Sequence, residues 1–356
     1  MSSDPALLDD PSAVAAADPR GMLAAVLGLG EQSRRGYAAG LAADGLPSGD
    51  ELHALVLCGM GGSGVAGDMI RALYRSRLIV PVDVVRDPAL PEHCDKDTIV
   101  VCSSYSGDTA ETLTLFEEAA RRGCRLVSVT AGGALATAAA EIEAPVVPVP
   151  GGLMPRAALG HLLLGTLGAL EAIGVVPELA EDVESAAATL SELAGEVAPE
   201  RPAASNEAKS LAVALQGRVP VVWGAEGIGA VAATRWKTDL NENAEVPAFA
   251  SALPELDHNE VVGWSAGAGD GFAVVALRHE DEHPGVAARF PVSEAVARDA
   301  GALVHEVLAR GGSPLGRLLS LVLLGGAMSV YLGILRGVDP GPIANIDRVK
   351  RELAGA

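Results

Sequence analysis

The chain has 356 residues, of which 49% are hydrophobic, and a formal net charge of −20 at pH 7. This length and apolar content can fill the cores of two ordinary domains. The acidic balance argues against nucleic acid as a partner, because nucleic-acid phosphates require a basic face. If the ligand is an anion, its site must be locally positive.

Residues 1–48 are expected to form an N-terminal helical extension. The sequence MSSDPALLDDPSAVAAADPRG has no basic region and no continuous apolar run, so nothing marks secretion and we expect a cytoplasmic protein. The longest apolar stretch, residues 318–335, carries glycines and a serine, which favours a buried helix over a membrane span. The four cysteines lie in or beside apolar runs without metal-like spacing, so we expect free thiols and no zinc at Cys58, Cys94, Cys102 and Cys124.

Residues 49–174 alternate short β-type runs with helical runs. The β-type runs are ALVLCG (54–59), VPVDVV (80–85), TIVVCSS (98–104), RLVSVT (125–130) and APVVPVP (144–150). Short apolar strands separated by helices predict a parallel sheet with crossover helices. Residues 175–206 read as a helical linker, and strand, glycine turn and helix return in 207–356. The sequence therefore predicts an α/β protein with two tandem doubly wound parallel-sheet domains.

A glycine loop follows the first run. In LCGMGGSGVAGD, residues 57–68, Gly59, Gly61 and Gly64 stand in the G-x-G-x-x-G register of dinucleotide-binding proteins. That interpretation also requires an acidic residue about 20 positions later, which Asp83 or Asp87 would supply. A tight turn between strand and helix, or a loop for another phosphate, explains the same glycines.

A second loop, SSYSGDTAET (103–112), is rich in hydroxyl groups and precedes a helix that we expect to begin near Thr109. Hydroxyls and free N–H groups at a helix N-terminus can hold a phosphate monoester without a basic side chain. The alternative is that Ser106, Asp108 or Thr109 only caps the helix. Two such loops suit a small sugar phosphate better than a dinucleotide. We expect Gly61, Gly62 and Ser63 to form the floor of a phosphate site, with Ser104, Ser106 and Thr109 as its cradle.

The segment 234–264 is the most unusual polar stretch of the chain. It contains Glu242 within NEN and His258 within HNE. A carboxylate and an imidazole are the usual pair for moving protons near neutral pH. From this segment alone, a structural histidine and a solvated glutamate remain open as the alternative.

Several motifs in order are similar to a known family. GMGGSGVAGD, SYSGDTAET, PRAALG, NENAEVPA and PELDHNEVVGW resemble the bifunctional phosphoglucose/phosphomannose isomerases of the sugar isomerase (SIS) domain superfamily. The resemblance runs from about residue 50 to the C-terminus. It implies SIS-type domains and interconversion of glucose 6-phosphate and mannose 6-phosphate with fructose 6-phosphate, with no cofactor and no metal.

The resemblance also implies roles for single residues. Glu242 would shuttle the proton between C2 and C1 through an enediolate, and Arg156 would stabilise the enediolate charge. His258 and Lys350 would open the sugar ring, while the phosphate would bind Ser63, Ser104, Ser106 and Thr109. Relatives in this family are dimers with the site at the interface, so we expect a homodimer in which His258 serves the partner subunit's site.

Two positions depart from the family pattern, because Asp108 and Glu245 add negative charge where relatives commonly have asparagine and lysine. Both changes put substrate affinity in question. Two other functions stay open from the sequence: a non-catalytic module that binds a sugar phosphate, and an NAD-dependent oxidoreductase that rests on the glycine loop alone. We expect no nucleic-acid or membrane partner.

Overall fold

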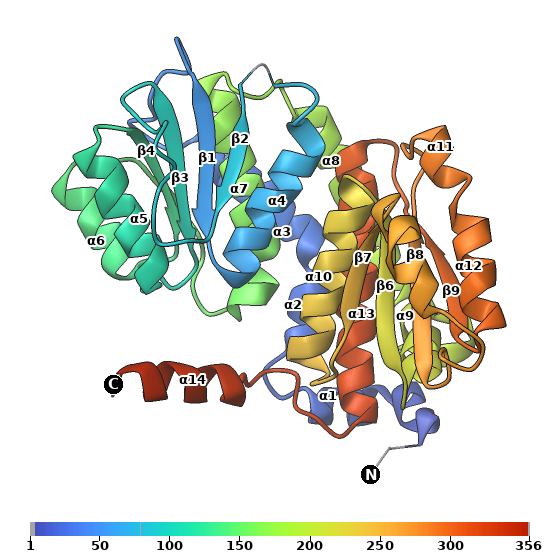
Figure 1. The fold of residues 1–356 in the computed structure, drawn as a ribbon. Coiled ribbons are helices and arrows are strands. Elements are labelled where there is room, and N and C mark those ends of the chain that lie inside the picture. The colour runs from blue at the N-terminus through green and yellow to red at the C-terminus, as the bar shows by residue number, and fades with distance from the viewer. Residues whose placement is uncertain (1–3, 79, 355–356) are drawn as a thin grey trace.

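The structure is a computed structural model that describes residues 4–78 and 80–354. Helices precede the first strand (Figure 1): η1 (Pro5–Asp9), α1 (Pro11–Ala17), α2 (Met22–Leu27) and α3 (Leu29–Leu41). Asp10 caps α1 by accepting from Ser12 N and Ala13 N, and Asp18 accepts from Met22 N and Leu23 N at the start of α2. These caps explain why the acidic N-terminal segment folds as short helices.

The first sheet is parallel, with strand order β2-β1-β3-β4-β5. Leu55 and Leu57 of β1 pack among residues of α4 and α7, while Val56 and Cys58 pack among residues of α5 and α6. Helices therefore cover both faces, as the apolar runs predict. The elements are β1 (Ala54–Gly59), α4 (Gly61–Tyr74), β2 (Val82–Val85), β3 (Thr98–Ser104), α5 (Ala110–Arg121), β4 (Arg125–Thr130), α6 (Gly133–Glu141), β5 (Val146–Pro148), η2 (Pro155–Ala158) and α7 (Leu159–Ile173).

The second sheet repeats this topology with strand order β7-β6-β8-β9, again parallel. It matches the first four strands of the first sheet, which confirms two doubly wound α/β units in tandem. Its elements are α9 (Glu207–Leu215), β6 (Val219–Ala225), α10 (Ile228–Asn243), β7 (Phe249–Leu253), η4 (Glu255–His258), η5 (Glu260–Gly263), β8 (Phe272–Arg278), α11 (Pro284–Ala287), α12 (Phe290–Asp299), β9 (Leu303–Leu308) and α13 (Pro314–Leu335).

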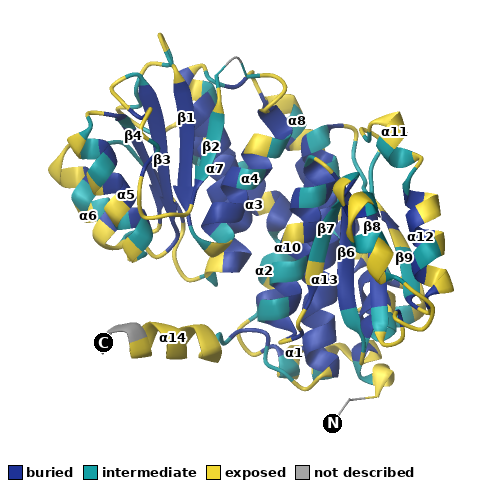
Figure 2. Ribbon diagram, viewed as in Figure 1, coloured by how far each residue is buried: buried dark blue, intermediate teal, exposed yellow. Residues whose placement is uncertain are grey.

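One apolar core runs between the two sheets and includes side chains of α3, α7, α8, α10 and α13. Helix α8 (Ala180–Glu196) packs against both α3 and α13, and α3 lies along α7. Figure 2 shows α7, α13 and the strands β1 and β3 largely buried, whereas α8 keeps an exposed face. The domain limits 1–48, 49–174, 175–206 and 207–356 stay predictions.

Helix α13 is long and apolar enough to cross a membrane, but its apolar window is wholly buried within the protein. The expected core helix over 318–335 is therefore confirmed. The last helix, α14 (Ala344–Ala354), projects from the body of the molecule and is exposed along its described side chains (Figures 1 and 2).

Candidate active site

The glycine and hydroxyl loops meet at one edge of the first sheet. Strands β1 and β3 are neighbours, and Gly59 at the end of β1 pairs with Ser103 near the end of β3. A Cβ atom at Gly59 would lie 2.9 Å from the Ser103 carbonyl oxygen, so only glycine lets the backbones approach this closely. Because both strands end here, the N-termini of α4 and α5 converge at the same edge.

The N-termini of both helices have N–H groups to offer to a ligand. Within the described residues, no side chain caps α4 or α5, although α5 starts after Thr109. The Thr109 hydroxyl lies 2.9 Å from that of Ser104, which also accepts from Gly107 N at 3.1 Å. Ser63 lies buried in the first turn of α4. This combination of hydroxyls and free N–H groups suits an anion.

Ser106 and Asp108 lie at the exposed side of the loop. The Ser106 hydroxyl accepts from Asp108 N at 3.2 Å. The Asp108 carboxylate does not cap α5, as the capping alternative supposes, but accepts from Ala134 N at 2.9 Å in the first turn of α6. The Asp108 charge is thus drawn to the N-terminus of a different helix.

Arg156 lies in η2, between the two units, and is only 4% exposed. Its Nε donates to Asn243 Oδ1 at 2.7 Å, and its Nη2 donates to the carbonyls of Pro340 and Gly341. Burial lowers the pKa of Arg156 and nearby carboxylates oppose the shift, so the guanidinium stays charged. Its backbone adjoins the glycine loop, since a Cβ at Gly62 would lie 3.4 Å from the Arg156 Cα atom.

Glu242 lies near the end of α10 and faces this guanidinium. Its Oε2 lies 3.6 Å from Arg156 Nη1, and its side chain is 26% exposed. A carboxylate that is partly open to solvent beside a buried cation can remove a proton from a ligand while the cation stabilises the resulting negative charge. The structure thus brings Glu242, Arg156 and the glycine loop together.

His258 and Lys350 lie elsewhere. His258 follows β7, and Leu253 at the end of β7 accepts from Glu226 N just before α10 begins, whereas Glu242 lies at the far end of α10. Helix α10 has 16 residues and is roughly 24 Å long at 1.5 Å per residue, and it runs from the edge where β7 ends to Glu242. Lys350 lies exposed on the projecting helix α14.

Sequence reasoning missed a buried polar group around Arg156. Arg235 pairs with Asp239 at 2.8 Å and donates to the Arg156 carbonyl at 2.7 Å. Burial raises the pKa of Asp239 to about 6 against the lowering effect of Arg235. The i, i+4 spacing of Arg235 and Asp239 on α10 signals their pairing, but their contact with η2 comes from the tertiary fold.

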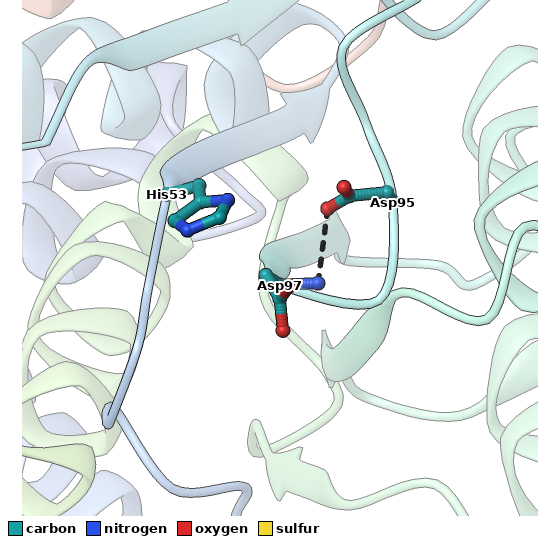
Figure 3. A group of neighbouring side chains, drawn as sticks. All are labelled: His53, Asp95 and Asp97. Carbon is teal, nitrogen blue, oxygen red and sulfur yellow. Dashed lines mark hydrogen bonds between the residues drawn. The ribbon is translucent and has the colours of Figure 1, made fainter.

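A further cluster, His53, Asp95 and Asp97, lies at the opposite edge of the first sheet (Figure 3). Its ligand atoms lie within 4.8 Å of one another. Both carboxylates already have partners, because Asp97 pairs with Lys96 at 2.6 Å and Arg125 at 3.2 Å, and Asp95 Oδ1 accepts from Asp97 N. The cluster therefore reads as a turn that fixes the start of β3.

Comparisons with known proteins agree with this geometry. A family model described as the bacterial phospho-glucose isomerase C-terminal SIS domain matches residues 204–353. The chain is 33% identical over 338 residues to the bifunctional phosphoglucose/phosphomannose isomerase of Caldicellulosiruptor bescii, covering 94% of this chain and 99% of that protein. It is 36% identical over 302 residues to the protein of that name from Aquifex aeolicus, covering 84% and 90% of the two chains.

The fold is also similar to a crystal structure described as a glucose-6-phosphate isomerase like protein from Thermus thermophilus. The TM-score is 0.62 at 19% identity, with 99% of each chain covered. Two parallel α/β units and a hydroxyl-rich loop at a sheet edge define a protein with tandem SIS domains. The chain belongs to the bifunctional phosphoglucose/phosphomannose isomerase family, as its motifs indicate.

Proposed function

We propose that this protein interconverts glucose 6-phosphate, and also mannose 6-phosphate, with fructose 6-phosphate. The observation that carries the proposal is the Glu242 carboxylate 3.6 Å from the buried Arg156 guanidinium, beside the glycine loop. Relatives that cover most of the chain are named for both activities. A sugar-phosphate substrate also fits the uncapped helix N-termini.

The reaction needs one base and one fixed cation. Glu242 takes the proton from C2 of the open-chain aldose, the C–H electron pair forms the C1=C2 double bond, and the carbonyl oxygen becomes an oxyanion beside Arg156. Glu242 then returns the proton to C1, and the hydroxyl proton of the C2 oxygen passes to the C1 oxyanion. The electrons left on the C2 oxygen form the ketose carbonyl as the C1=C2 double bond is lost. The two aldoses differ only in their configuration at C2, so using both requires room in the site to present either C2 proton to Glu242.

The phosphate is assigned to the helix N-termini of α4 and α5, with the hydroxyls of Ser63, Ser104, Ser106 and Thr109 as donors. Gly61 and Gly62 leave the floor of the site free of side chains. Ring opening is assigned to His258 and Lys350 by their correspondence with the family motifs. A cytoplasmic location stays a prediction.

We assign the protein to a homodimer in which His258 reaches the partner subunit's site. Support comes from α10, because β7, which leads to His258, ends beside the start of that helix, whereas Glu242 lies near its far end. Mixing tests the arrangement. If Glu242→Gln and His258→Ala proteins exchange subunits, each heterodimer has one site with neither defect, and activity returns. A mixture that stays inactive after confirmed subunit exchange contradicts the shared site.

The function itself is tested by steady-state assays on the wild-type protein. Fructose 6-phosphate is supplied with a chelator present, and glucose 6-phosphate is detected by a coupled enzyme. Turnover, followed by turnover of both aldoses in the reverse direction, is expected. Saturable binding of fructose 6-phosphate without turnover would instead support the sugar-phosphate-binding module.

A further inference from the structure

Asn243, the residue that follows Glu242, uses both ends of its side-chain amide. It is almost wholly buried at the end of α10. Its Oδ1 accepts from Arg156 Nε at 2.7 Å, and its Nδ2 donates to the Ser329 hydroxyl at 2.9 Å. The amide thus connects the α10 end of the site to α13.

Ser329 fixes which way the amide faces. Its hydroxyl donates to the Gly326 carbonyl at 2.8 Å, so the oxygen lone pairs are what it offers to Asn243. The Asn243 NH₂ group must therefore face Ser329, and its carbonyl oxygen must face Arg156. A flipped amide would place its NH₂ group against the Arg156 N–H, and two donors would be opposed.

The Arg156 guanidinium is in this way held along the edge formed by Nε and Nη2. Nε is fixed by Asn243 and Nη2 by the carbonyls of Pro340 and Gly341, which leaves Nη1 directed at Glu242. A planar guanidinium with two fixed nitrogens cannot rotate about its long axis. The Nη1 group is therefore held on the side of the guanidinium that faces Glu242, the proposed base.

We propose that Asn243, oriented by Ser329, is a positioning residue that aims Arg156 at the developing oxyanion. The inference rests on the proposed function, because it assigns Arg156 a partner in the same reaction. This positioning role differs from a purely structural one, because Asn243 then affects turnover only through Arg156.

Single variants give the first part of the test. Asn243→Ala is expected to lower kcat about 10- to 100-fold, the cost of a misplaced catalytic group, and to leave KM within about threefold. Ser329→Ala lowers kcat in the same direction by less. The matched control is Ser320→Ala, a buried serine of α13 whose hydroxyl binds Arg310 N and the Arg317 carbonyl instead. The control keeps the wild-type kcat even where its melting temperature falls.

A double-mutant cycle gives the second part. In the Arg156→Met background no guanidinium is left to aim, so adding Asn243→Ala or Ser329→Ala should lower kcat by less than about threefold. Equal losses in both backgrounds would overturn the positioning role and leave the proposed function intact. A wild-type protein without turnover would overturn both.

Discussion

Asp108 brings a negative charge next to Thr109, the last residue before α5 and one of the residues assigned to the phosphate. Its carboxylate is nevertheless engaged with Ala134 N in the first turn of α6, where the helix dipole favours an anion. The added negative charge at this position is therefore bound by a neighbouring helix. We expect Asp108 to stabilise the fold and to leave phosphate binding in the loop unchanged.

Asp108→Ala should consequently cost stability and leave substrate binding unchanged. Loss of a capping carboxylate lowers the free energy of unfolding by about 1 kcal/mol, and KM for fructose 6-phosphate should stay within about twofold. Denaturant unfolding and steady-state kinetics measure the two effects. A KM that falls several-fold would show that the carboxylate repels the phosphate after all.

At the scale of elements, two strand–helix units carry the loops to which the phosphate is assigned, and one carries Glu242, the proposed base. The loops after β1 and β3 lie together because those strands are neighbours in a parallel sheet. The loop after β8 is the counterpart in the second unit, and there Glu282 accepts from His279 N and pairs with Arg278 at 2.8 Å. The Glu282 carboxylate thus takes up the His279 N–H in the second unit and places a negative charge in that loop. This agrees with a phosphate site in the first unit only.

Substitutions in the loop 103–112 at the start of α5 should weaken substrate binding more than they slow the chemical step. Thr109→Val and Ser106→Ala would each remove one of the charge-assisted hydrogen bonds proposed to the phosphate, worth roughly 1.5–3 kcal/mol, so KM should rise more than kcat falls. Thr114→Val is the matched control, since the Thr114 hydroxyl bonds the Ala110 carbonyl on the exposed side of the same helix. An unchanged KM in both loop variants would remove these residues from the site.

At the scale of the whole molecule, the N-terminal segment ties the two units together. Helix α3 packs along α7, while α2 packs against α13 and against η2, which carries Arg156. Lys209 anchors the start of this segment: its fully buried Nζ donates to the carbonyls of Leu8, Pro199 and Arg201 at 2.5–2.7 Å. The N-terminal segment, which lies outside the family motifs, therefore packs against the element that carries Arg156.

Removing that anchor should destabilise the protein. Lys209→Met leaves three carbonyls without their donor, at about 1–3 kcal/mol for a buried unsatisfied group, so the melting temperature should fall by several degrees. Lys96→Met is the control, because the Lys96 side chain is 77% exposed and its ammonium pairs with Asp97 at the surface. Its melting temperature should change little. Equal melting temperatures for the two variants would contradict the anchoring role.

Acid should destabilise the protein through one buried and two half-buried histidines. Burial lowers the pKa of His161, His279 and His305 from 6.5, so the stability they contribute is present above pH 6.5 and is lost as pH falls below it. Asp239, with its pKa raised to about 6, opposes this by gaining a proton in the folded state below that pH.

One histidine can be isolated by comparing variants. His279→Gln should shrink the loss of unfolding free energy between pH 7 and pH 5, because a neutral side chain has no proton to gain. The exposed His53→Gln serves as the control. Identical pH dependence in wild type and His279→Gln would contradict the assignment.

The sequence predicts the strands and the loop chemistry well because both are local. The runs 54–59, 98–104 and 125–130 coincide with β1, β3 and β4, since buried parallel strands are continuous apolar runs. The pairing of Asn243 with Ser329 joins residues 86 positions apart, and no local pattern signals it. The place of His258 likewise depends on the edge at which β7 ends, and the direction of Asp108 on the nearness of α6.

The most direct test follows the proton. Fructose 6-phosphate is incubated with the wild-type protein and with Glu242→Gln in deuterium oxide, and the signals of the C1 and C2 protons are followed by NMR. The wild type is expected to isomerise the sugar with incorporation of solvent deuterium. In the variant, both isomerisation and exchange should fall by about 10²–10⁴-fold, while the affinity for the sugar phosphate is kept. Exchange and isomerisation at wild-type rates in Glu242→Gln would contradict the assignment of Glu242 as the base.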